Sequence, residues 1–370
     1  MITPLRRSIC RACRQSQVSH LRRGLATAAS GRSQIPTNNQ VKIVEVGPRD
    51  GLQNEKKAIP LATKIELIER LSRTGLSTIE AGSFVSPKWV PQMANSSEIL
   101  GHLLQSKMEA PVPMTYSFLA PNIKGLQTAE SLLAEHPRTF GTQQDPIAGR
   151  PSVEIAVFAA ATETFTRKNL NCDIQTSLER FRQVIQSGKA LGLRVRAYIS
   201  VALGCPFEGH DVDPHRVAQI ATDLLESGAD EISLGDTTGM GTAPRTSALL
   251  RCMAAAGIRN EDVAMHFHDT YGQALVNTAV ALEHGIRTFD SSVGGLGGCP
   301  YSPGATGNVA TENVVYFMET LGMQTGVDLD AVADIGAWIT GELGKANDSA
   351  VGKAVLGARA RDAADADAKA

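Results

Sequence analysis

The sequence predicts a (β/α)8 TIM barrel with additional C-terminal helices, and three observations support this fold class. Short apolar runs of strand-like composition recur eight times, and segments long enough for one crossover helix separate them. Together the eight units occupy about 260 residues, which matches a closed eight-stranded barrel. Ionisable residues also collect where the predicted strands end, and such barrels carry their active sites there. An open, doubly wound sheet is the alternative, but it usually has fewer strands.

The predicted strands span residues 41–46, 77–81, 114–120, 152–158, 195–201, 231–235, 263–267 and 287–293. The first connecting helix is expected over 62–71, where Ile65, Ile68 and Leu71 fall on one face. The same spacing of apolar residues returns over 217–225. Periodicity therefore supports an alternation of strands and amphipathic helices.

The chain divides into four expected segments. Residues 1–34 contain seven arginines and no acidic residue, which is the composition of a mitochondrial transit peptide, with a disordered basic tail as the alternative. The catalytic barrel is expected over 41–300, and a helical extension packed on it over 301–355, with one helix near 311–321. Residues 356–370 show little apolar pattern, so we expect a disordered tail there.

Composition narrows the possible partners. No apolar stretch approaches the roughly 18 residues that a membrane span needs, so we expect no membrane partner. Seven of the 36 Lys and Arg lie in the leader, which leaves 29 basic against 38 acidic residues, a net charge near −9. This negative net charge argues against binding to the phosphates of a nucleic acid. The six cysteines are too widely spread for a disulfide framework, so we expect reduced thiols.

A metal site is predicted at the end of the seventh strand. His266 and His268 are two residues apart, and side chains at this spacing on a strand share one face. A purely structural role is the alternative for such a pair alone. Asp50 follows the first strand and would supply a carboxylate at the same rim. Imidazole and oxygen ligands together favour Mg²⁺ or Mn²⁺ ahead of Zn²⁺.

Two further features lie at this rim. Arg49 precedes Asp50 and would place a cation beside a carbonyl oxygen that becomes an enolate, although a surface ion pair is the alternative. The glycine-rich segment 294–308 permits a mobile loop that closes over a substrate, and Cys299 within it is an unusual place for a core thiol. Asn308 at its end is either a metal ligand or a helix N-cap.

These motifs resemble the 3-hydroxy-3-methylglutaryl-CoA (HMG-CoA) lyase family. The resemblance covers about residues 41–325 and rests on the long motifs at 44–55, 83–93, 234–237, 268–275 and 295–301. It implies that the metal ligands are Asp50, His266, His268 and Asn308. It also implies roles for residues around the metal: Glu80 supports it through a water, Arg49 holds the thioester carbonyl, Cys299 transfers a proton from the lid, and Ser83 and Thr237 bind the substrate carboxylate. Two departures are Phe267 between the histidines, where animal relatives carry Cys, and the lack of a cysteine near the C-terminus.

The resemblance implies a divalent-metal-dependent cleavage of HMG-CoA to acetyl-CoA and acetoacetate, as in leucine degradation and ketone-body formation. Asp50 or His266 would remove the hydroxyl proton. We expect a homodimer in the mitochondrial matrix. The alternatives are a lyase for a related branched 3-hydroxyglutaryl-CoA, a Claisen-condensing relative of the isopropylmalate synthase type, and a non-catalytic barrel that serves as a binding protein.

Overall fold

The computed structural model describes residues 39–53, 55–106, 110–136, 139–141, 150–298 and 307–368. Residues 40–370 form one compact unit. The expected leader at 1–34 lies outside the described residues, as does Cys299.

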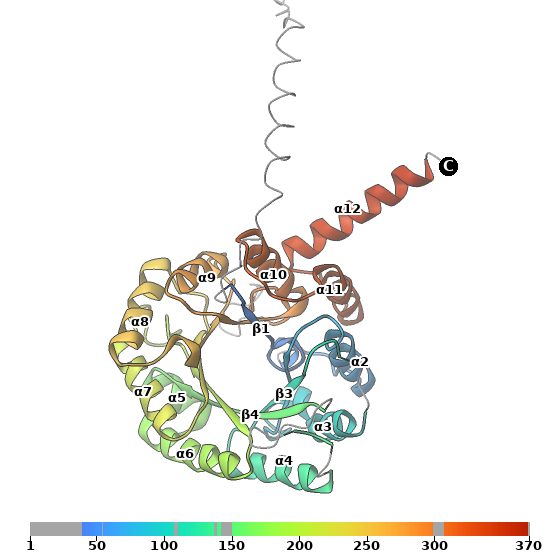
Figure 1. The fold of residues 1–370 in the computed structure, drawn as a ribbon. Coiled ribbons are helices and arrows are strands. Elements are labelled where there is room, and N and C mark those ends of the chain that lie inside the picture. The colour runs from blue at the N-terminus through green and yellow to red at the C-terminus, as the bar shows by residue number, and fades with distance from the viewer. Residues whose placement is uncertain are drawn as a thin grey trace, which may run out of the picture. The chain divides into compact units, whose positions relative to one another are not determined.

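Eight parallel strands close into one barrel in chain order, which confirms the predicted fold class (Figure 1). The barrel closes where β8 pairs with β1, with Thr288 opposite Lys42. Each strand begins and ends within a few residues of its prediction. The strands are β1 (Lys42–Glu45), β2 (Thr78–Ser83), β3 (Thr115–Leu119), β4 (Ser152–Ala160), β5 (Arg194–Ser200), β6 (Glu231–Asp236), β7 (Val263–Phe267) and β8 (Thr288–Ser291).

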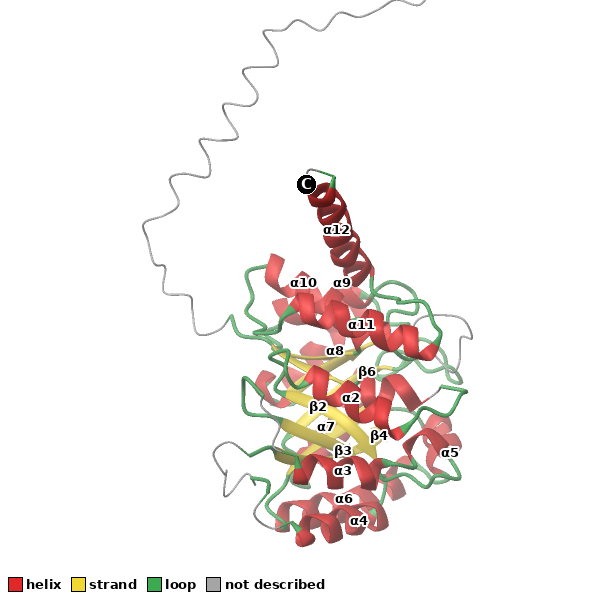
Figure 2. Ribbon diagram, turned by 90° about the vertical axis from the view of Figure 1, so that its right-hand side faces the viewer, coloured by secondary structure: helices red, strands yellow, loops and turns green. Residues whose placement is uncertain are grey.

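Helices surround the strands as an outer ring (Figures 1 and 2). Within the described ranges, four short helical turns, η1 to η4, lie in the connections between the longer elements. The turns are η1 (Gly47–Gly51), η2 (Pro91–Met93), η3 (Asn260–Asp262) and η4 (Val293–Gly295). The helices are α2 (Leu61–Leu71), α3 (Ser96–Gln105), α4 (Ile123–Glu135), α5 (Glu163–Leu170), α6 (Ile174–Ala190), α7 (Pro214–Glu226), α8 (Ala243–Ala255), α9 (Ala274–Glu283), α10 (Thr311–Thr320), α11 (Leu329–Leu343) and α12 (Ala350–Asp367).

Helix α7 shows how local sequence produces these elements. The Asp213 side chain caps its first turn by accepting a hydrogen bond from His215 N at 2.9 Å. Val217 and Leu224 are buried, as the apolar spacing predicts. Gly228 ends the segment with a φ of 109°, a conformation that side-chain-bearing residues rarely adopt. The helix therefore starts, packs and stops at positions that its sequence marks.

Helix α12 corrects the expected disorder over 356–370, because it continues to Asp367. Ser349 caps it by accepting a hydrogen bond from Gly352 N at 2.9 Å, and its alanine-rich sequence favours a helix without tertiary packing. Residues 357–368 are all exposed, which explains the missing apolar pattern. The helix extends away from the barrel beyond its contacts with α10 and α11 (Figure 2).

Among the helices of the described ranges, none is both long enough and apolar enough to cross a membrane.

Candidate active site and metal centre

The loop after β1 carries the first two site residues. Its turn η1 is a π-helical turn, in which the backbone N–H groups of Arg49, Asp50 and Gly51 all donate to the carbonyl of Val46. Such turns are rare and occur often at functional sites. This turn follows β1 directly and brings the Arg49 and Asp50 side chains to the carboxyl end of the barrel.

Strand β7 and the residue after its end bring two imidazoles to Asp50. Ligand atoms of Asp50, His266 and His268 all lie within 4.8 Å of one another, so the structure brings together three of the four predicted metal ligands. The two imidazole rings have centroids 5.3 Å apart. His266 Nε2 faces Asp50 Oδ2 at 3.9 Å.

The chemistry of these donors fits a divalent cation. Buried His268 has no hydrogen-bond partner for its Nδ1 among the described residues, and an unpaired buried polar atom is costly. Burial, helped by the nearby His266, lowers the pKa of His268 to about 4, so this imidazole is neutral. Burial opposes ionisation of Asp50, yet Arg49 and the two histidines bring its pKa down to about 2. Neutral nitrogen and anionic oxygen are the states that bind metal.

Asn308 joins this group from the far side of the glycine-rich segment. Its Nδ2 donates to Asp50 Oδ2 at 2.8 Å and to the carbonyl of Leu296 at 3.3 Å. The residue also forms an antiparallel bridge with His268. Helix α10 has Ala310 at its N-cap, so the alternative that Asn308 caps this helix is wrong.

Arg49 is held by two carboxylates. Its Nη1 contacts Asp50 Oδ1 and its Nη2 contacts Glu80 Oε2, each at 2.7 Å. Tyr198 donates its hydroxyl to the same Glu80 oxygen at 3.1 Å. The Arg49 side chain is only 8% exposed, so the alternative of a surface ion pair is wrong. Burial raises the pKa of Glu80 although Arg49 opposes this shift, and the guanidinium stays charged between its two partners.

Asp290 on β8 is a site residue that the sequence analysis missed. Its Oδ2 lies 3.1 Å from His266 Nδ1 and accepts a hydrogen bond from Ser233 Oγ at 2.9 Å. Its Oδ1 accepts from Arg196 Nη2 at 2.6 Å inside the barrel. Because a carboxylate only accepts, His266 donates from Nδ1 to Asp290, and its Nε2 lies on the side of Asp50. Burial opposes the charged ring, but Asp290 and Asp50 raise the pKa of His266.

Ser83 and Thr237 occupy the same rim, at the ends of β2 and β6. Ser83 is buried, and its Oγ accepts a hydrogen bond from Val85 N at 3.2 Å. Thr237 Oγ1 accepts from Val201 N at 2.9 Å. Val201 has a φ of 54°, an outlier for a β-branched residue, and strained backbone of this kind is concentrated at functional sites. Both hydroxyls thus stabilise rim backbone in this structure.

Two buried carboxylates hold the start of the glycine-rich segment. Glu45 Oε1 accepts from Gly47 N at 2.8 Å and from Val293 N at 3.0 Å. Glu312 accepts from Gly294 N through both of its oxygens, at 3.1 and 3.0 Å. Burial raises the pKa of Glu45 to about 7 and that of Glu312 to about 8. The buried carboxylate of Glu45 therefore connects the η1 turn to the segment that begins at residue 293.

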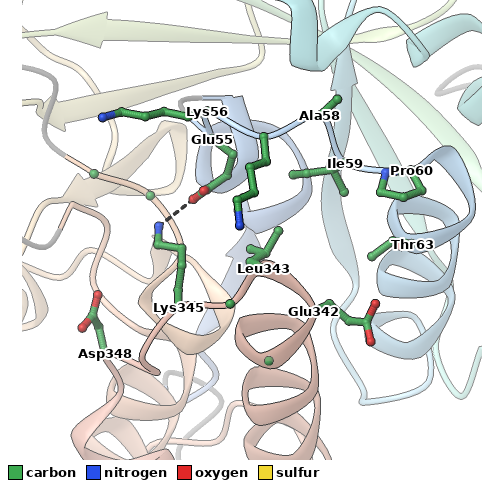
Figure 3. A pocket seen from close by; sticks show the side chains of 15 residues that line it. Glu55, Lys56, Ala58, Ile59, Pro60, Thr63, Glu342, Leu343, Lys345 and Asp348 are labelled. Carbon is green, nitrogen blue, oxygen red and sulfur yellow. Dashed lines mark hydrogen bonds and ion pairs between the residues drawn. The ribbon is translucent and has the colours of Figure 1, made fainter.

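A cleft of about 770 Å³ opens beside this segment. One wall is the stretch from Glu55 to Pro60, and another is the end of α11 with the residues after it. Figure 3 shows Lys345 reaching Glu55 across the cleft, with an Nζ to Oε1 distance of 2.6 Å. Gly297 lines the cleft too, and a Cβ built on it would lie 2.9 Å from Asn308 Nδ2. The cleft therefore adjoins the candidate metal centre.

Comparisons with known proteins agree with this architecture. The HMGL-like family profile matches residues 40–339. A 3-hydroxy-3-isohexenylglutaryl-CoA/hydroxymethylglutaryl-CoA lyase of Pseudomonas aeruginosa is 50% identical over 318 residues, covering 86% of this chain and 97% of that protein. A mitochondrial hydroxymethylglutaryl-CoA lyase of Bos taurus is 46% identical over 336 residues, covering 90% of this chain and 95% of that protein.

Solved structures show the same relationship. The crystal structure of hydroxymethylglutaryl-CoA lyase from Pseudomonas aeruginosa aligns with a TM-score of 0.76 and 49% identity, over 86% of this chain and 98% of that one. An HMG-CoA lyase of Acinetobacter baumannii, solved in complex with coenzyme A and 3-methylmalate, aligns with a TM-score of 0.74 and 32% identity, over 86% and 96%. By sequence and by fold, this chain belongs to the HMGL-like family, alongside the hydroxymethylglutaryl-CoA lyases.

Proposed function

We propose that this chain is a carbon–carbon lyase that cleaves HMG-CoA to acetyl-CoA and acetoacetate with a divalent cation. The observation that carries the proposal is the convergence of Asp50, His266 and His268 beside the buried Arg49. This arrangement offers a metal site and a fixed cation at one point of the barrel mouth. Family membership supports the same reaction.

The proposed metal ligands are Asp50, His266, His268 and Asn308, with Mg²⁺ or Mn²⁺ as the ion. The described donors are two imidazoles, a carboxylate and an amide, without a thiolate, which favours these hard ions. When bound, the ion would acidify the tertiary hydroxyl of the substrate and orient it.

Other residues of the site are proposed to remove the hydroxyl proton, stabilise the enolate and deliver a proton to it. Asp50 or His266 removes the hydroxyl proton, and the electron pair left on oxygen forms a carbonyl as the carbon–carbon bond breaks. The departing fragment is the enolate of acetyl-CoA, whose negative charge develops next to Arg49. Glu80 and Asp50 keep the guanidinium of Arg49 in place for this purpose. Cys299 on the lid, or a water that it positions, then delivers a proton to the enolate carbon.

Ser83 and Thr237 are proposed to contact the substrate carboxylate. Both lie at the rim, on β2 and directly after β6. Each hydroxyl accepts a backbone hydrogen bond in the structure. A hydroxyl can donate a hydrogen bond, and a carboxylate is an acceptor.

The cleft beside Gly297 is proposed to hold the coenzyme A part of the substrate. Lys56 and Lys57 are exposed on one wall and offer positive charge to phosphates, whereas Lys345 is already paired with Glu55. Glu342 and Asp348 line the cleft at α11 and beyond, so we expect the phosphates on the side of Lys56 and Lys57. The cleft adjoins the metal centre through Gly297 and Asn308. Coenzyme A bound in the cleft would therefore place its thioester near Arg49.

One assay tests the reaction. Purified protein treated with EDTA should release no acetoacetate from HMG-CoA, and added Mg²⁺ or Mn²⁺ should restore release with one acetyl-CoA formed per acetoacetate. Activity that resists metal removal would contradict the metal-dependent mechanism. Condensation of acetyl-CoA with a 2-oxo acid, without cleavage, would point to the condensing alternative.

A lyase for a longer branched 3-hydroxyglutaryl-CoA remains a second candidate. The relative from Pseudomonas aeruginosa, at 50% identity, is named for 3-hydroxy-3-isohexenylglutaryl-CoA as well as the methyl compound. We propose the methyl compound as the preferred substrate. The ratio of kcat/KM for the two thioesters measures the preference, and a ratio that favours the isohexenyl compound would reverse this assignment.

We also propose a homodimer in the mitochondrial matrix. Mitochondrial relatives support this location, although cytoplasmic and bacterial relatives have comparable identity. If residues 1–34 are a transit peptide, the protein purified from mitochondria should begin near the end of that segment. An intact Met1 in the organelle would contradict the proposal, and sedimentation of the purified protein measures the oligomer.

A further inference from the structure

We propose that Gln92, anchored by the buried Lys64, is a positioning residue that holds one wall of the cleft in the shape that binds coenzyme A. This inference rests on the proposed assignment of the cleft to coenzyme A. Gln92 does not line the cleft itself, so it would act through the backbone of the wall.

The wall needs support because residues 55–59 belong to no helix or strand. The Gln92 side chain provides it at three points. Its Nε2 donates to the carbonyls of Glu55 and Lys57, each at 2.6 Å, and its Oε1 accepts from Ile59 N at 3.3 Å. One side-chain amide thus uses both its donors and its acceptor on alternate residues of the wall. The path of the backbone between Glu55 and Ile59 sets where Lys56 and Lys57 can present their ammonium groups.

Lys64 holds Gln92 from the other side. It lies on α2 and is only 2% exposed, and its Nζ donates to the backbone carbonyl of Gln92. Its Nζ also lies 3.5 Å from Asn95 Oδ1. A buried ammonium is costly unless it is hydrogen-bonded, so this contact holds the turn η2, which carries Gln92, against α2.

A second tie connects η2 to the barrel. Ser96 Oγ donates to the carbonyl of Met93 at 2.8 Å and accepts from Ser83 N, at the end of β2, at 2.9 Å. The turn is therefore fixed to α2 through Lys64 and to β2 through Ser96. Through its amide, Gln92 connects the irregular wall to these fixed elements. A wall held in its binding shape before the ligand arrives lowers the entropy cost of binding.

The experiment measures the affinity for free coenzyme A by calorimetry in the full chain. Gln92→Met removes all three side-chain hydrogen bonds at similar length, and Lys64→Met removes the anchor. We expect each to weaken coenzyme A binding by about tenfold and to raise KM for HMG-CoA in parallel, with kcat within about twofold of wild type. Mn²⁺ affinity should be unchanged, because neither residue belongs to the metal centre. A general loss of folding would lower kcat and Mn²⁺ affinity as well.

Matched variants separate the possible outcomes. Lys64→Arg keeps a donor for the Gln92 carbonyl and should recover most of the affinity. Gln127→Met on the exposed face of α4 removes an amide far from the cleft and should leave binding unchanged. The Lys56→Ala, Lys57→Ala double variant tests the cleft assignment independently. If the double variant weakens binding and Gln92→Met does not, the positioning role is wrong and the cleft assignment stands. If neither weakens binding while HMG-CoA is still cleaved, the cleft assignment is wrong and the inference falls with it.

Discussion

The barrel mouth and helix α12 use charged residues in opposite ways. At the mouth, Arg49 is nearly buried and is held between two carboxylates. On α12, Arg359 bonds Asp334 at 2.6 Å, yet both side chains are about half exposed. Breaking a buried pair leaves an uncompensated charge in a poorly hydrated place, whereas water replaces an exposed partner. The same kinds of side chain therefore hold a fixed, buried charge at one place and contribute little at the other.

The largest expected effect comes from the metal centre. His266→Ala or Asp50→Ala removes one of the four proposed metal ligands and should abolish measurable HMG-CoA cleavage and Mn²⁺ binding. Circular dichroism should show an intact barrel, because the strands close without these side chains. Near-normal turnover and metal affinity in either variant would contradict the proposed ligand set.

The second-largest loss of activity is expected for Arg49→Gln. It removes the cation that we propose stabilises the developing enolate, so we expect kcat to fall by about 10²–10³ or more. Mn²⁺ affinity should persist, because Arg49 is not a proposed ligand. Steady-state kinetics with metal titration separates the two effects. An equal loss of metal affinity and kcat would instead assign Arg49 the task of holding Asp50 in place.

Cys299→Ser should also reduce kcat, by about 10²-fold or more, if the thiol delivers the proton. A hydroxyl has similar shape but a far higher pKa than a thiol. Cys299 lies outside the described residues, and this prediction follows from the family resemblance. Unchanged kcat would reduce the thiol to a packing role.

Asp290→Asn should have an intermediate effect, which falls on metal affinity rather than on folding. The amide can no longer accept hydrogen bonds from His266, Ser233 and Arg196 together, and partners behind metal-bound histidines contribute about 10- to 100-fold in affinity. We expect Mn²⁺ affinity to fall within that range. The matched variant Ser233→Ala removes one neutral donor and should weaken binding less. Wild-type Mn²⁺ affinity in Asp290→Asn would show that His266 needs no such partner.

The barrel and its principal site residues were predictable because they follow from local patterns. The spacing of apolar runs predicts all eight strands, and the two-residue spacing of His266 and His268 predicts their shared face. Asp290 was not predictable, because a single aspartate within a strand gives no local sign that it faces His266. The contacts of Gln92 span more than 30 residues of chain and depend on how two irregular loops pack. Long-range polar contacts of this kind need the tertiary structure.

Helix α12 was mispredicted for the complementary reason. An apolar stripe marks a helix that packs against other elements, and α12 has almost none, since only Gly352 of its residues is buried. Its helical structure follows from its alanine content and its serine cap, which are local signals and do not depend on packing. The absence of an apolar stripe predicts only that the segment is exposed, and it does not predict disorder.

The smallest expected effect is therefore the removal of residues 357–370. The truncation keeps Ser349 and Gly352, the cap and the buried position of α12, and removes described residues that are all exposed. It also removes Arg359 and its exposed pair with Asp334, which solvent already screens. We expect the melting temperature to change by less than about 2 °C and kcat to stay the same. Thermal unfolding and HMG-CoA cleavage of the truncated and full chains measure both quantities. A large fall in melting temperature would contradict this expectation and would indicate that this end of α12 packs against a second copy of the chain. In that case the melting temperature of the truncated chain should fall at low protein concentration and recover at high concentration.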